Sequence, residues 1–260
     1  MSYVSHCLLL LLSVLGFASV SRAAEDSRVF ELRIYETQPG KLDALLARFR
    51  DHTVRLFEKH GMTNVGYWLP LDASDGAGAK LIYVLAHSSR DAAKASWAAF
   101  RADPDWQATQ KASEASGPIL IHPPESIFLK TTDYSPLVQP AGSTKETRVF
   151  ELRTYTTPEG KLDALNARFR DHTRALFAKH AITSVAYWTP LDTDKGAGHT
   201  LTYLLAHPNR DTATKSWEAF RADPDWVKAK AASEKDGGSL TVPGGVKSVF
   251  LTPTDFSPLQ

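Results

Sequence analysis

Alternating apolar and polar residues open each half of the chain. Between residues 29 and 35 one face of the alternation is apolar and the other polar: Phe30, Leu32 and Ile34 against Glu31, Arg33 and Tyr35. A period of two over seven residues predicts a β-strand. From Lys41 to Gly61 the apolar residues instead recur in steps of three and four, which predicts an amphipathic helix.

Further along, apolar runs predict strands at residues 63–71, 80–87 and 126–130, with a helix at 90–101 between the last two. Asp103 and Pro104 are the residue types favoured at a helix N-cap and first helical position, and they predict another helix to about Ser116. The resulting order is β-α-β-β-α-β, the ferredoxin-like unit.

The whole pattern recurs 120 residues later. Residues 28–117 and 148–237 share 57 identities in 90 positions without a gap. This spacing indicates a duplicated domain rather than a solenoid repeat. We therefore divide the chain into repeat 1 (28–134), a Pro-, Ser-, Thr- and Gly-rich linker (135–147) and repeat 2 (148–256).

In a ferredoxin-like unit the helices cover one face of an antiparallel sheet and leave the other bare. Two units in one chain can press their bare faces together. The predicted fold is α+β: two tandem ferredoxin-like repeats paired as a pseudo-dimeric α/β barrel with the helices outside. Association of chains beyond this internal pairing is left open by the sequence.

The N-terminus has the features of a leader. Residues 7–20 form an apolar run, shorter than the ~20 residues of a membrane span, and small residues follow it. We expect a signal peptide at 1–24 and an exported protein, periplasmic or extracellular, with no stable membrane span after cleavage; a retained anchor is the alternative. Cys7, the single cysteine, lies in this segment, so the mature chain would have no disulfide or thiolate site.

The composition narrows the function classes. A formal net charge of +1 gives no indication of a nucleic-acid partner. The sequence has no P-loop, strand-linked GxGxxG, GxSxG, HExxH or cysteine pair. It therefore predicts no metal site and no cofactor.

Several motifs in the same order resemble the NIPSNAP domain. They are VFELRIY, PGKLDALLARFRDHT, FEKHG, WAAFRADPDWQ and FLKTTDYSPL, and they cover nearly all of both repeats. The resemblance implies a dimeric α/β barrel, here built from one chain as a pseudo-dimer. It implies no defined activity; eukaryotic members are linked to mitochondria and vesicle traffic.

The candidate site depends on which face of the first strand the helices cover. If they cover the apolar face, the polar residues point into the barrel, where a carboxylate, a guanidinium and a phenol could orient a small ligand. The alternative is that Glu31 and Arg33 pair across strands and help the two sheets to dock. On the third strand, Tyr83 and His87 share a face, and His87 could act as a base or merely end the strand. The candidate cavity residues are Glu31, Arg33, Tyr35, Tyr83, His87, Glu151, Arg153, Tyr155, Tyr203 and His207.

Two functions from different classes follow. The chain could bind a small molecule in the barrel and could act on it as a cofactor-independent enzyme, an inference that rests on analogy of fold. Alternatively it could be a non-catalytic interaction or structural module that recognises a partner through its outer helices or rim loops. The residues alone assign no catalytic role and leave enzymatic activity undecided.

Overall fold

The computed structural model describes residues 26–138 and 148–260. The proposed signal peptide and most of the linker lie outside these residues. Within them, no helix is both long and apolar enough to cross a membrane.

Both repeats have the predicted order of elements. Repeat 1 comprises β1 (Val29–Glu36), α1 (Leu42–Arg48), the π-helical turn η1 (Phe49–Thr53), α2 (Val54–Lys59), β2 (Thr63–Pro70), η2 (Ala73–Asp75), β3 (Lys80–His87), α3 (Arg90–Ala102), α4 (Pro104–Ser113) and β4 (Glu125–Thr131). Repeat 2 comprises β5 (Val149–Thr156), α5 (Leu162–Arg168), η3 (Phe169–Thr173), α6 (Arg174–Lys179), β6 (Thr183–Pro190), η4 (Thr193–Lys195), β7 (Thr200–His207), α7 (Arg210–Ala222), α8 (Pro224–Glu234) and β8 (Val246–Pro253).

The predicted helix from Lys41 to Gly61 contains one irregular turn. At η1 the chain widens into a π turn, and the Thr53 hydroxyl donates to the Arg48 carbonyl at 3.0 Å. This extra turn keeps Phe49, Leu56 and Phe57 on the same buried side. Repeat 2 has the same turn at η3, with Thr173 bonded to Arg168.

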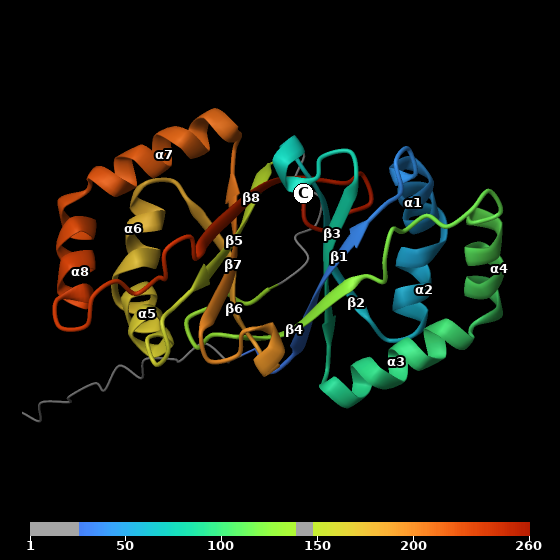
Figure 1. Ribbon diagram of the computed structural model, residues 1–260, viewed down its shortest axis with the longest axis horizontal. Helices are drawn as coiled ribbons and strands as arrows, with labels where there is room; N and C mark the ends of the chain where they lie inside the picture. Colours follow the sequence, from blue (N-terminus) through green and yellow to red (C-terminus); the bar gives the residue numbers. More distant parts are fainter. Residues whose placement is uncertain (1–25, 139–147) are drawn as a thin grey trace, which may run out of the picture.

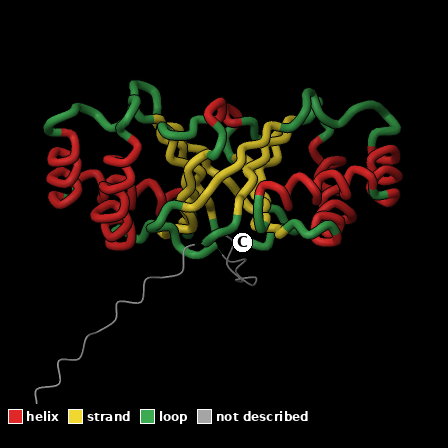
Figure 2. The backbone as a smooth tube through the Cα atoms, turned by 90° about the horizontal axis from the view of Figure 1, so that it is seen from below, coloured by secondary structure: helices red, strands yellow, loops and turns green. Residues whose placement is uncertain are grey.

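The strands form one closed barrel in the order β1-β3-β2-β8-β5-β7-β6-β4. Each repeat supplies half of it, and the halves join where β2 pairs with β8 and β4 pairs with β6. The helices pack outside, at the two ends of the molecule, with the strands between them (Figures 1 and 2). The predicted pseudo-dimeric barrel is confirmed.

The barrel interior is an apolar core shared by the repeats. Trp188 of β6 packs on Phe30 of β1 with ring centroids 5.6 Å apart, and Trp68 of β2 packs on Phe150 of β5 at 5.5 Å. Two further cores, one in each repeat, lie between the sheet and its helices. β1 and β5 are therefore buried on both faces.

The segment after each repeat's last strand packs on the other repeat. After β4, Tyr134 packs at a tilt on Tyr187 of β6 with ring centroids 5.3 Å apart, and Ser135 accepts the Tyr187 backbone N–H at 3.0 Å. After β8, Phe256 packs on Tyr67 of β2, and Ser257 accepts the Tyr67 N–H at 2.9 Å. We call residues 132–138 and 254–259 the exchanged tails.

Candidate functional site

The polar residues of β1 lie outside the barrel, beneath the helices. Phe30 and Leu32 belong to the barrel core, whereas Tyr35 packs with the helix residues Leu45 and Phe49. The prediction that Glu31, Arg33 and Tyr35 point into the barrel was wrong, and so was the same prediction for Glu151, Arg153 and Tyr155. The physical reason is that the more apolar face of each first strand, with Phe30 and Leu32 or Phe150 and Leu152, packs in the apolar interior of the barrel.

Glu31 is the centre of a buried hydrogen-bonded cluster. Its Oε1 accepts from Arg33 Nη1 and Ser126 Oγ, both at 2.6 Å. Its Oε2 accepts from Trp97 Nε1 of α3 at 2.7 Å and lies 3.1 Å from His87 Nε2. The carboxylate thus meets four polar groups from three strands and one helix. Arg33 pairs with Glu31 along one strand rather than across strands.

These contacts set the charge of the cluster. Burial alone would raise the pKa of Glu31, but the His87 hydrogen bond, the Arg33 charge and the bonds from Ser126 and Trp97 outweigh it and lower the pKa to about 2. Burial likewise opposes the charge of Arg33, yet the neighbouring Tyr83, Tyr35 and Glu31 raise its pKa. Glu31 and Arg33 therefore form a permanent buried ion pair at neutral pH.

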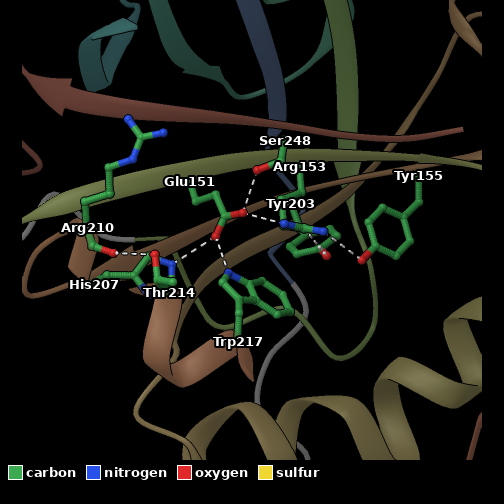
Figure 3. A network of polar contacts seen from close by, with 9 residues as sticks. All are labelled: Glu151, Arg153, Tyr155, Tyr203, His207, Arg210, Thr214, Trp217 and Ser248. Carbon is green, nitrogen blue, oxygen red and sulfur yellow. Dashed lines mark hydrogen bonds and ion pairs between the residues drawn. The ribbon is translucent and has the colours of Figure 1, made fainter. Parts of the chain in front are cut away.

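Repeat 2 contains the same cluster around Glu151, whose pKa is also lowered to about 2 against the cost of burial (Figure 3). Arg153 and Ser248 bond one oxygen, and Trp217 and His207 bond the other at 2.7 and 3.0 Å. Here the arginine makes two more bonds. Arg153 Nε donates to Tyr203 at 2.9 Å, and Nη2 donates to Tyr155 at 3.2 Å.

The residues predicted on the third strand of each repeat lie next to these two glutamate clusters. His87 and His207 end β3 and β7, as predicted, and are fully buried against the glutamates. Tyr83 and Tyr203 lie deeper, among the aromatic rings of the helix–sheet cores. All ten predicted residues thus lie in two equivalent clusters beneath the helices, five in each repeat.

A cavity of about 480 Å³ opens over the repeat 1 cluster. We call it the α3 cavity. Glu31, Arg33 and Ser126 form its floor, Trp97 and Phe128 are apolar walls, and α3 contributes Arg90, Lys94 and Arg101. The spacing 90, 94, 97 and 101 places these residues on one stripe of the helix.

The sequence did not lead us to predict Arg90, Lys94 and Arg101 of α3 as site residues. Charges on an amphipathic helix are usually assigned to solvent, although their shared stripe with a buried tryptophan was a usable signal. Arg90 lies over the Phe128 ring at 4.1 Å and pairs with Asp192 of repeat 2 at 2.7 Å. Among the described residues, Lys94 and Arg101 are exposed and have no ion-pair partner.

Nine residues line the α3 cavity, and their counterparts in repeat 2 differ from them at one residue only. Thr214 stands where repeat 1 has Lys94, and its hydroxyl bonds the Arg210 carbonyl at 3.1 Å. Arg210 pairs with Asp72 of repeat 1, as Arg90 pairs with Asp192. Each cluster is therefore rimmed by an ion pair to the other repeat.

A family comparison matches both repeats. The NIPSNAP family model covers residues 30–136 and 150–258, most of the chain. The chain belongs to the NIPSNAP family. Among curated proteins none matches this NIPSNAP chain.

Two solved structures share the fold of this NIPSNAP pair, and a third matches one part of it. An anthrone oxidase-like protein is 12% identical, with a TM-score of 0.56 over 91% of this chain and 95% of its own. A protein from Fusobacterium nucleatum provisionally named a monooxygenase is 10% identical, with a TM-score of 0.54 over 87% and 92%. A NIPSNAP family protein of unknown function from Agrobacterium tumefaciens, 19% identical with a TM-score of 0.38, covers 46% of this chain and 99% of its own.

The chemistry available to the NIPSNAP site is charge recognition. The part of the chain that the structure describes has no group of His, Cys, Asp or Glu residues arranged to hold a metal ion. Glu31 is saturated with donors and ionised, so it is a poor proton donor or acceptor near neutral pH. The groups free to meet a ligand are the cations and aromatic walls of the α3 cavity.

Proposed function

We propose that this NIPSNAP chain binds a small anionic molecule in the α3 cavity of repeat 1, and more weakly at the equivalent position of repeat 2. One observation carries the proposal: four cationic side chains face a cavity of about 480 Å³ with only two carboxylates on its wall. A volume of this size suits a small organic ligand.

The charge balance favours an anion. Arg33 is neutralised by Glu31, and Arg90 is paired in part by Asp192. Lys94 and Arg101 add positive charge that Asp91 offsets only in part. A carboxylate or phosphate entering between them would form charge-assisted hydrogen bonds, with Trp97 and Phe128 contacting its apolar part.

Binding is favoured over catalysis by the geometry of the histidine. His87 would be the base of a cofactor-independent enzyme, but its ring is buried and its Nε2 lies against Glu31. The oxidase-like and monooxygenase names of the structural neighbours support only the shared fold.

An interaction module is the weaker alternative. The large apolar side chains exposed in the described residues belong to separate segments: Leu71, Ile121, Leu137, Val227 and Val246. Single exposed apolar residues are ordinary on a protein surface and need no partner.

We also propose that the mature chain is exported after removal of residues 1–24. The proposal rests on the apolar run at 7–20 and the small residues that follow. N-terminal sequencing of the protein from an extracytoplasmic fraction should begin near Glu25. An intact N-terminus in the membrane fraction would support a retained anchor instead.

Calorimetric titration with inorganic phosphate, citrate and benzoate tests the binding site. Lys94→Thr makes repeat 1 resemble repeat 2 and should weaken binding about two- to fivefold, the effect of ~0.5–1 kcal/mol from an exposed charge. Thr214→Lys is the matched variant and should strengthen binding in repeat 2 by a similar factor. Both positions are on the surface, so the melting temperature should stay unchanged.

Native mass spectrometry of the protein from its own source complements the titration, because it reports a retained small molecule directly. If no anion binds and no ligand is retained, the proposal fails. It also fails if Lys94→Thr and Thr214→Lys both bind every probe with the affinity of the wild type and added salt does not change that affinity.

A further inference from the structure

The two helix–sheet cores have diverged although their aromatic rings match at every position except Phe256 in repeat 1 and Tyr134 in repeat 2. Repeat 1 packs leucine or valine at four positions around its core where repeat 2 has polar residues: Leu46, Val54, Leu69 and Leu120 against Asn166, Arg174, Thr189 and Thr241. Backbone hydrogen bonds show that Leu120 and Thr241 occupy equivalent positions in the two repeats. The next residue in each repeat donates its N–H to the first strand at 3.0 Å, Ile121 to Glu36 and Val242 to Thr156.

At Thr241 this change accompanies a cavity of about 150 Å³ in repeat 2. We call it the aromatic cavity. Its inner surface is formed by the buried rings of Phe169, Phe177 and Phe220. In repeat 1, Leu120 packs onto the corresponding core. The cavity lies on the side of Tyr155 that faces α5, η3 and α8, apart from the Glu151 carboxylate.

Polar groups lie at defined points on the wall of the aromatic cavity. The Arg168 side chain is only 4% exposed and bonds Glu234 at 2.9 Å. Its buried Nε has no partner in the described residues, as is also true of the equivalent Arg48 Nε in repeat 1. Tyr155 receives a hydrogen bond from Arg153, which ties this wall to the Glu151 cluster. Lys230 and Ser239 are exposed, and they mark the opening to solvent.

We propose that the aromatic cavity binds one small planar aromatic molecule with a single polar substituent, such as a phenol. Edge-to-face contacts with phenylalanine rings favour an aromatic ligand over an aliphatic one. An apolar cavity of about 150 Å³ accommodates benzene, so one six-membered ring fits and a fused bicyclic ring does not. The polar substituent satisfies the unpartnered Arg168 Nε.

The site is separate from the α3 cavity in residues and in ligand class. The two share no lining residue, and the α3 cavity is cationic whereas this one is aromatic. The proposal therefore stands whether or not repeat 1 binds an anion.

Fluorine NMR titration with 4-fluorophenol tests the assignment in the full chain. Thr241→Leu fills the cavity with the residue that repeat 1 already has, and it should weaken binding by about tenfold or more. The matched Leu120→Thr change opens the corresponding space in repeat 1 and should add a second bound ring per chain. 4-Fluorophenol should bind at least about tenfold more tightly than cyclohexanol, which has the hydroxyl but not the ring.

The paired design keeps the test decisive if one variant folds poorly, because the variants shift binding in opposite directions. Loss of binding in Thr241→Leu with an unchanged response to phosphate supports the aromatic site. Wild-type affinity in Thr241→Leu overturns it, as does a Leu120→Thr variant that folds but gains no second site. Equal binding of cyclohexanol and 4-fluorophenol also overturns it.

Discussion

Replacing Glu31 by Gln tests whether the buried charge of the cluster stabilises the fold. The change keeps the size of the side chain but removes the negative charge facing Arg33. The folded state lowers the pKa of Glu31 from its ordinary value of 4.5 to about 2. At about 1.4 kcal/mol for each pH unit, this fall corresponds to about 3 kcal/mol of stability. Loss of one partner of a buried ion pair costs a similar ~3–5 kcal/mol.

The sign of the pH dependence follows from the direction of the shift. A carboxyl group whose pKa is lowered in the folded state stabilises the protein fully above its unfolded pKa of 4.5. That stabilisation is lost progressively as the pH falls from 4.5 through the folded pKa of about 2, and only below that value is Glu31 protonated in both states. The difference between wild type and Glu31→Gln should therefore be about 3 kcal/mol at pH 7 and should shrink through this window.

Guanidinium denaturation followed by tryptophan fluorescence at pH 7, 5, 4 and 3 would measure this difference. Other acidic groups titrate in both proteins, so the difference curve isolates Glu31. Glu151→Gln should behave alike, because Glu151 makes the same contacts. Glu125→Gln, at an exposed position with no ion pair in the described residues, is the control. A loss that stays constant from pH 7 to 3 would show that shape or amide placement, and not charge, causes the destabilisation.

Two further changes test the barrel and the exchanged tails. Phe30→Ala removes a fully buried ring that contacts Trp188 of the other repeat, and it should cost about 3–5 kcal/mol in chemical denaturation; a cost under about 1 kcal/mol would mean that the barrel interior is loosely packed. Ser257→Ala leaves the buried Tyr67 N–H without its acceptor and should cost about 1–3 kcal/mol, with faster hydrogen exchange at that amide. Ser135→Ala should act in the same way on Tyr187, and an unchanged exchange rate in both variants would exclude this role of the serines.

The elements of the fold could be predicted because each has a local signal. β3 begins and ends where the apolar run at 80–87 does, and Asp103 caps α4 with its carboxylate on the Asp105 N–H, as its position before Pro104 indicates. The π turn at η1 could not be predicted in this way. The apolar spacing of a helix survives one extra residue, and only the Thr53 bond to the Arg48 carbonyl reveals the wider turn.

The candidate residues could be predicted, but their surroundings could not. Glu31, Arg33 and His87 do come together. The alternation in β1 shows two faces but not which one meets the helices, because both are buried. The Glu31 carboxylate also accepts hydrogen bonds from Trp97 and Ser126, which lie 66 and 95 residues further along the chain. No local pattern links such distant positions.

The exchanged tails have a consequence for how the two halves depend on each other. Tyr134 and Ser135 of the first half cover β6, and Phe256 and Ser257 of the second cover β2, so either half alone would leave its outer strand uncovered. In a dimer of separate chains, this mutual coverage would weaken on dilution. Here the covalent connection fixes the local concentration of one half around the other, so the pair stays assembled however few molecules are present.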